Sequence, residues 1–193
     1  MSINEILEVE NYCNLSRLLN KGLIQLYQEI FAEPPEYQIW PEVKLSELFS
    51  FYQSSGHLFV AVARLEQPIG FCAILPLTVS SIWQTVVSDG FSTYTLNQDF
   101  LYYKFGIDSQ SAWYVADLGV AAQHRKLGLG TKLIQRAIAC RKPMLLRVSL
   151  VRSQAIALYN RVGFEPINLF QKANYKQQNG SVKTFEKMLM LIK

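Results

Sequence analysis

The sequence is poor in the residues that build disulfide frameworks and zinc sites. Its 193 residues include three cysteines (Cys13, Cys72 and Cys140) and two histidines. An odd number of widely separated cysteines does not make a disulfide framework, and two histidines cannot complete a zinc site of the usual ligand spacing. We therefore expect free, mostly buried thiols in a reducing compartment, and no bound metal.

Long apolar runs and concentrated charge are also missing. No run approaches the roughly 20 apolar residues that a membrane-spanning helix needs. The opening residues, MSINEILEVE, lack the basic start and apolar stretch of a signal peptide. The net charge of +4 is not gathered in one segment, which argues against a nucleic-acid partner and suits an anionic small molecule. The sequence thus predicts a cytoplasmic protein that binds neither membrane nor nucleic acid.

Hydrophobic residues, by contrast, make up 50% of the chain. No linker, repeat or low-complexity tract divides them, which predicts a single domain over residues 1–193. Apolar residues at helical spacing predict helices over 15–31, 43–52, 129–140 and 153–161. Alternating or continuous apolar runs predict strands over 3–9, 57–64, 68–77, 113–120, 143–150, 164–173 and 184–192. Together these elements predict a mixed α/β sheet.

A long connection, residues 78–111, separates two of the predicted strands. It is rich in aromatic side chains, namely Trp83, Phe91, Tyr94, Phe100, Tyr102, Tyr103 and Phe105. A connection of this length is usually functional or locally structured. Two interpretations stay open: a helical insertion that buries its own aromatic residues, and a lid over a substrate.

The segment RKLGLGTKLI, residues 125–134, places two glycines between a predicted strand and a predicted helix. Glycine permits positive φ and close approach of the backbone to a ligand, and the N-terminus of a helix attracts anions. The spacing matches neither the G-x-G-x-x-G of dinucleotide-binding folds nor the G-x-x-x-x-G-K-[ST] of the P-loop. The pattern that is present, R-x-x-G-x-G from Arg125 to Gly130, indicates an anion-binding turn.

A second motif follows one strand later, in SQAIALYNRVGFEP at residues 153–166. The two together resemble the GNAT superfamily of N-acetyltransferases, with its (Q/R)-x-x-G-x-(G/A) loop and its A-x-x-L-Y-x-x-x-G-F segment. The resemblance covers about residues 112–168. It implies a mixed, mostly antiparallel central sheet with splayed central strands flanked by helices, and acetyl-CoA as the co-substrate. A ligand-free α/β domain is the alternative.

The resemblance also implies residues that bind acetyl-CoA. The pyrophosphate would lie on the backbone of the turn, and the pantetheine arm would pair with the end of the preceding strand, where the Leu118 N–H would face the thioester oxygen. The implied set is Leu118, Gly119, Val120, Arg125, Lys126, Leu127, Gly128, Leu129, Gly130 and Thr131, together with Ser153, which we also expect to cap the following helix. Two positions depart from the family pattern: Ala122 replaces a frequent proline, and Arg152 replaces a frequent asparagine.

Two residues are the candidates for proton transfer. Tyr159, in the Leu-Tyr pair, is the implied general acid for the coenzyme A thiolate, and helical spacing also places it on a core stripe. Asp117 is the carboxylate of the predicted strand 113–120 and the candidate general base, or else a partner for a neighbouring loop. Some relatives carry a glutamate base three residues earlier, where this chain has Tyr114. Glu33 and Glu36 are further candidates.

These observations predict an N-acetyltransferase that moves the acetyl group of acetyl-CoA directly to an amine, without a covalent enzyme intermediate. The alternative is a catalytically silent acyl-CoA-binding module that acts as a sensor or interaction domain. The sequence leaves open whether the acceptor is a small amine, a protein N-terminus or a lysine, and whether two copies form a homodimer.

Overall fold

The computed structural model describes residues 5–34, 37–177 and 179–193. These residues form a nine-stranded sheet in the order β1-β2-β3-β6-β7-β9-β8-β4-β5. The strands are β1 (Glu5–Glu8), β2 (His57–Val62), β3 (Pro68–Pro76), β4 (Val86–Ser88), β5 (Thr93–Thr95), β6 (Trp113–Val120), β7 (Met144–Ser149), β8 (Glu165–Lys176) and β9 (Val182–Ile192). All neighbours pair antiparallel except β6 and β7, which are parallel. The predicted mixed, mostly antiparallel sheet is confirmed.

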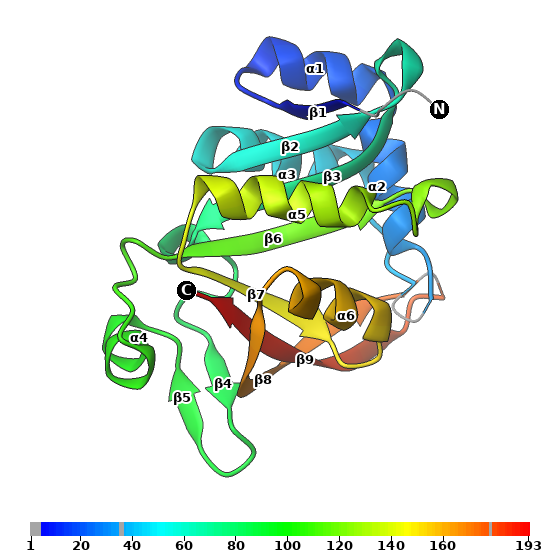
Figure 1. Ribbon diagram of the computed structural model, residues 1–193. Coiled ribbons are helices and arrows are strands. Elements are labelled where there is room, and N and C mark those ends of the chain that lie inside the picture. Colours follow the sequence, from blue (N-terminus) through cyan, green and yellow to red (C-terminus); the bar gives the residue numbers. More distant parts are fainter. Residues whose placement is uncertain (1–4, 35–36, 178) are drawn as a thin grey trace.

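The parallel pair in the middle of the sheet is short. β6 and β7 pair only where Trp113 meets Met144 and Tyr114 meets Leu145, and beyond this point the two strands diverge (Figure 1). On its other side, β6 continues to pair with β3 as far as Val120. A register shift in this pairing leaves Ala116 without a partner residue on β3. The β7-facing edge of residues 116–120 is therefore without a strand partner, which confirms the predicted splayed central strands.

Helices cover both faces of this sheet. They are α1 (Tyr12–Asn20), α2 (Leu23–Phe31), α3 (Glu42–Ser55), α4 (Gln98–Phe105), α5 (Leu129–Cys140) and α6 (Ser153–Arg161). Alternate residues of β3 face opposite layers: Phe71 and Ala73 pack in the cluster of α1, α2 and α3, whereas Cys72 and Ile74 pack in the cluster of α5 and α6. In Figure 1, α5 and α6 lie on one side of β6 and β7, with α2 and α3 on the other. A strand buried on both faces explains the continuous apolar run of β3.

The predicted helix over residues 15–31 is wrong in one respect, because the chain breaks it into α1 and α2. Gly22 has φ +101, so it leaves the helical region and precedes the first residue of α2. α1 also starts earlier than expected, since the Asn11 side chain accepts a hydrogen bond of 3.0 Å from the Asn14 N–H. Apolar spacing continues across the break because both helices bury the same side.

The insertion at residues 78–111 forms the β4–β5 hairpin and α4 rather than a mainly helical unit. Strand β4 joins the far part of the sheet through Ser88 and Phe170. Four buried residues of the insertion share a core cluster with residues of β7, β8 and β9, namely Ile82, Val87, Leu96 and Leu101. Several of its aromatic side chains are not buried, and Phe91 is 99% exposed. The insertion therefore extends the sheet beside β8.

Candidate active site

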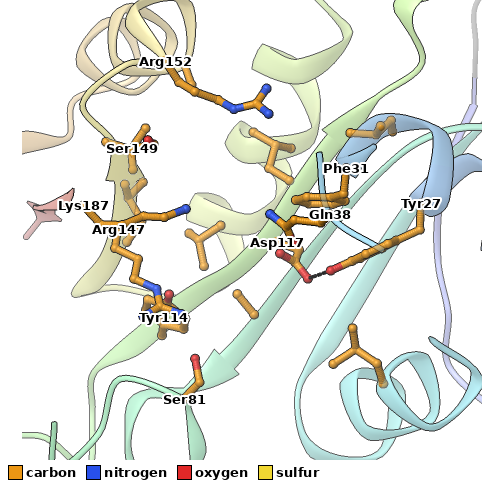
Figure 2. Close-up of a pocket in the computed structure, with 18 of the residues that line it drawn as sticks. Tyr27, Phe31, Gln38, Ser81, Tyr114, Asp117, Arg147, Ser149, Arg152 and Lys187 are labelled. Atoms are coloured by element: carbon orange, nitrogen blue, oxygen red, sulfur yellow. Dashed lines mark hydrogen bonds between the residues drawn. The ribbon is translucent and has the colours of Figure 1, made fainter. Parts of the chain in front are cut away.

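A cavity of about 440 Å³ occupies the space where β6 and β7 diverge. Its walls come from both layers: α2 and α3 contribute from one face, α6 from the other, and β6, β7 and β9 supply the strands between them. Figure 2 shows the labelled side chains around this cavity, with Arg152 on one side and Tyr27 on the opposite side. Of residues 78–111, Ser81 lines the cavity, so the structure does not support a lid over the substrate.

The glycine-containing turn lies between the end of β6 and the start of α5. Gly128 has φ +80 and its added Cβ would meet nothing within 4 Å, so the left-handed backbone is what requires glycine there. Gly130 allows close packing, because a Cβ would lie 3.0 Å from Leu158 Cδ1 on α6 and that side chain would have to shift. The first turn of the 12-residue helix α5 presents backbone N–H groups without intrahelical partners, an arrangement suited to an anion.

Arg125 does not direct its guanidinium to this turn. It forms a bidentate ion pair with Glu33, at 2.7 and 2.8 Å, and its Nε donates to the Val120 carbonyl at 2.9 Å. Its charge is therefore balanced within the protein by the Glu33 carboxylate. The same pair engages Glu33, one of the candidate bases, whereas Glu36 lies outside the described residues.

The other residues predicted to bind acetyl-CoA lie at the end of β6, in the turn, and at the starts of α5 and α6. Leu118 lines the cavity at the unpaired edge of β6. At Gly119 an added Cβ would lie 2.9 Å from Ile30 Cδ1 and 3.0 Å from the Phe71 ring, so glycine lets α2 and β3 pack closely on β6. Lys126 and Leu127 are exposed in the turn, whereas Leu129 is buried at the start of α5. Ser153 is the first residue of α6, and the N-cap position belongs to Arg152, so the expected capping role of Ser153 is wrong.

Asp117 faces the cavity and is held by two phenols from the opposite helical layer. Its Oδ2 accepts a hydrogen bond from Tyr27 at 3.0 Å and another from Tyr52 at 2.5 Å, and Figure 2 shows the contact with Tyr27. Burial raises the pKa of Asp117, while the two hydrogen bonds and the nearby cations Lys187 and Arg147 oppose that rise. The phenols come from α2 and α3, so Asp117 is tied to helices rather than to a neighbouring loop.

Tyr159 reaches the cavity from α6, on the other face of the sheet. Its ring packs edge-on against Phe164 with centroids 5.9 Å apart, so the core position that helical spacing predicts is confirmed, and the side chain also lines the cavity. Burial raises the pKa of Tyr159, which keeps its phenol protonated at neutral pH. Burial likewise raises the pKa of Cys72, so this thiol does not form the thiolate that a nucleophile needs.

Cys13, Cys72 and Cys140 are all free, but the expectation of mostly buried thiols holds only for Cys72, since Cys13 is exposed and Cys140 half-buried. Within the described ranges, no group of three or more His, Cys, Asp or Glu side chains gathers to hold a metal ion. The part of the chain that the structure describes also contains no helix with the length and apolar character needed to cross a membrane.

Several cavity residues have no signal in the sequence. Tyr27 and Tyr52 belong to apolar helical stripes and read as core positions, while Tyr114 is buried and its pKa is raised to about 12, chiefly by burial. Arg147 is the single charge within strand β7, and Lys187 is one of three charged residues within β9. Only the pairing of those strands, and the gap beside β7, brings them to the cavity.

The profile described as the acetyltransferase (GNAT) family matches residues 21–164. Among solved structures, Arabidopsis thaliana NAA60 in complex with acetyl-CoA is similar with a TM-score of 0.62 and 20% identity, over 97% of this chain and 98% of that one. The ribosomal-protein-S18-alanine N-acetyltransferase from Escherichia coli is similar with a TM-score of 0.61 and 16% identity, over 98% and 93%. At these identities the likeness concerns the fold. No curated protein matches the sequence significantly.

Proposed function

The chain belongs to the acetyltransferase (GNAT) family, and on this premise we propose that it transfers the acetyl group of acetyl-CoA directly to an amine. The observation that carries the proposal is the cavity between β6 and β7, where Asp117 and Tyr159 enter from opposite faces of the sheet. Acyl transfer from a thioester to an amine uses a base that takes a proton from the amine and an acid that gives a proton to the departing thiolate. This cavity offers a carboxylate and a phenol in that relation.

Acetyl-CoA would bind along the free edge of β6. Its pyrophosphate would meet the first turn of α5, where the N–H groups and the helix dipole favour an anion. Its pantetheine arm would follow residues 118–120, which lack a strand partner on the β7 side. This places the thioester beside Leu118, at the cavity. There the backbone N–H of Leu118 would stabilise the oxyanion of the tetrahedral intermediate.

The reaction then proceeds by deprotonation of the amine, attack on the thioester and loss of the thiolate. An alkyl amine is mostly protonated at neutral pH, so Asp117, directly or through water, takes one proton and frees the lone pair. The nitrogen attacks the thioester carbon, and collapse of the intermediate breaks the carbon–sulfur bond. Tyr159 donates a proton to the departing thiolate, while the attacking nitrogen loses its second proton to solvent, from which the Tyr159 phenol regains its proton. Neither phenol on Asp117 uses Oδ1, which leaves that oxygen to accept the amine proton.

A thiol-release assay with a panel of amines tests this function. The panel contains small primary amines, amino acids, and a peptide with N-terminal alanine, because the similar Escherichia coli protein is named for that acceptor. Acetyl-CoA at about one hundred times its dissociation constant is expected to stabilise the protein by about 2.7 kcal/mol, or a rise in Tm of roughly 5–11 °C for a chain of this length.

Amine-dependent thiol release, with the acetylated amine identified by mass, is the expected result. Thermal stabilisation by acetyl-CoA with no turnover on any amine would instead favour a silent acyl-CoA-binding module. The absence of both would overturn the assignment of the cofactor.

A further inference from the structure

The charged groups on the acceptor side of the cavity are unbalanced. Asp117 supplies one carboxylate, while Arg147 and Lys187 supply two cations that also line the cavity. Within the described residues neither cation forms an ion pair with a carboxylate. A partly buried cation without a counter-charge is costly unless a ligand provides the charge.

The partners of both cations are neutral and hold them in place. Arg147 donates to Gln171 Oε1 at 2.6 Å, and Gln171 in turn donates to Thr85 Oγ1 at 2.7 Å. Lys187 lies over the ring of Tyr175, with its Nζ 4.8 Å from the centroid. These contacts orient the side chains, and because Asp117 is one carboxylate beside two cations, the three charged groups together keep a net positive charge. Through Thr85 and Gln171, the insertion at 78–111 thus holds Arg147 in place.

A third polar group completes the cluster. Ser149 is only 3% exposed, lines the cavity, and its hydroxyl is the buried side-chain oxygen in the described chain that has no hydrogen-bond partner. It lies directly opposite Lys187 in the β7–β9 pairing and two residues from Arg147, so the three side chains share one face of the sheet. Buried hydroxyls normally have partners, which points to a ligand atom at this place.

This face is not the one that carries the glycine turn. Leu145 and Leu189, which share the face of the cluster, pack on the side away from α5, whereas Leu146 and Val148, on the opposite face, pack against α5 and α6. The phosphates of acetyl-CoA at the turn would therefore lie on the other layer. In Figure 2, Lys187, Arg147 and Ser149 stand across the cavity from Asp117 and Tyr27.

From these observations we infer that the acceptor is an amine that also carries an anionic group, in the first place a carboxylate. The inference rests on the proposed acetyl transfer and names its substrate class. Arg147, Lys187 and Ser149 bind the anionic group, while the amine lies at Asp117. Tyr27, Phe31, Trp40, Phe51 and Tyr52 also line the cavity and suit an acceptor with an apolar or aromatic side chain. Polyamines are disfavoured, because the two cations repel them.

The test compares three acceptors of one shape: phenylalanine, phenylalaninamide, and the aminophosphonate in which a phosphonate replaces the carboxylate. We expect kcat/KM for phenylalanine to exceed that for the amide at least tenfold. The amide has the less basic amine and hence more free amine at neutral pH, so this preference cannot come from amine ionisation. A faster phosphonate would identify a phosphate-type group as the anion within the same class. Equal rates, or a preference for the amide, would overturn the inference.

Variants locate the anion site. Lys187→Met keeps most of the side-chain length and is expected to raise KM for phenylalanine roughly ten- to a hundredfold, the range for losing a hydrogen bond to a charged group. Any effect that the loss of Lys187 has through Asp117 acts on both acceptors, so the deciding quantity is the ratio of the KM values for phenylalanine and the amide, which should rise by the same ten- to hundredfold. Lys183→Met is the matched control, because Lys183 also lies on β9 over a ring, that of Phe185 at 5.1 Å, and does not line the cavity.

Calorimetry of phenylalanine binding to the protein loaded with coenzyme A separates this inference from the proposed function. Tighter binding of phenylalanine than of its amide, lost in Lys187→Met, supports the anion site even where no acetyl transfer is detected. Equal binding of both, with or without turnover, overturns it.

Discussion

Asp117 is a carboxylate whose surroundings act on its charge in opposite directions. Burial raises its pKa, and the phenols of Tyr52 and Tyr27 and the cations Lys187 and Arg147 restrain the rise. A general base works best when its pKa approaches the operating pH. A carboxyl group with a raised pKa is closer to that condition than an exposed aspartate.

This arrangement predicts a pH dependence. The base form of Asp117 is lost as pH falls through its raised pKa, so kcat/KM should decline on the acid side above the ordinary aspartate range. Asp117→Asn should lower the rate near neutral pH roughly 10²- to 10⁴-fold. The rate of this variant should recover as rising pH supplies free amine.

Tyr52→Phe removes a hydrogen bond that lowers the pKa of Asp117. The acid limb of the kcat/KM profile of this variant should therefore move to higher pH.

The measurement is kcat/KM against pH for the wild type and these variants. Tyr94→Phe is the control, since its hydroxyl also donates to a carboxylate, Asp89, at 2.8 Å but lies in the insertion. Its profile should overlay that of the wild type. Parallel profiles for Asp117→Asn and the wild type would show that Asp117 is not the base.

Tyr159→Phe tests the acid. The ring keeps its contact with Phe164, so the Tm should hardly change, and acetyl-CoA should bind within a few-fold of the wild-type affinity. Turnover is expected to fall roughly ten- to a thousandfold, because a positioned proton donor is lost. An acyl donor whose leaving thiol is more acidic should narrow the difference. Equal kcat values at saturating substrates, with chemistry limiting, would leave Tyr159 as a packing residue.

At the scale of elements, the turn before α5 offers a matched pair of glycines. Gly128 and Gly106 have φ +80 and +68, and an added Cβ at either meets nothing within 4 Å. Alanine should therefore cost each about 1–2 kcal/mol of unfolding free energy through backbone strain. Only Gly128→Ala should also weaken acetyl-CoA binding, because its Cβ stands where the backbone approaches the pyrophosphate.

Urea unfolding and calorimetric titration with acetyl-CoA measure the two effects separately. An unchanged dissociation constant in Gly128→Ala, together with the expected loss of stability, would remove the turn from the cofactor site and leave it a structural feature.

Elements with strong local signals were predictable from the sequence. The bounds of β6, α5 and α6 follow from apolar runs and helical spacing with glycine nearby, and the structure gives those bounds. The break at Gly22 was missed, because the apolar stripe runs through it without a proline. The cavity was only half predictable: Asp117 and Tyr159 lie in motifs, whereas Arg147, Lys187 and Ser149 depend on strand pairing that no local pattern encodes.

At the scale of the whole molecule, one ion pair joins the two sides of the site. Arg125 follows β6 beside the glycine turn, and Glu33 follows α2, 92 residues earlier. The side chains are 35% and 29% exposed, so solvent screens the pair in part. Its bidentate geometry still makes it stronger than an ordinary surface contact.

A double-mutant cycle with Glu33→Gln and Arg125→Gln should give a coupling free energy of about 1 kcal/mol in urea unfolding. Each single variant should also weaken acetyl-CoA binding a few-fold, since the pair positions the turn. The same cycle on Arg17 and Glu66, a 3.1 Å contact with more exposed side chains, should give a smaller coupling and no effect on the cofactor. Unchanged acetyl-CoA affinity in both Glu33→Gln and Arg125→Gln would show that the pair does not position the turn.

The divergence of β6 and β7 also bears on how the protein avoids aggregation. Free strand edges recruit strands from other chains, and proteins keep their outer edges short for this reason. Here the outermost strands, β1 and β5, have 4 and 3 residues, while the free edge at 116–120 lies inside the sheet between helical layers. An incoming polypeptide would need space for side chains on both faces of that gap. A thin linear ligand with amide groups does not, so the molecule presents a hydrogen-bonding template that a cofactor arm can use and a foreign strand cannot.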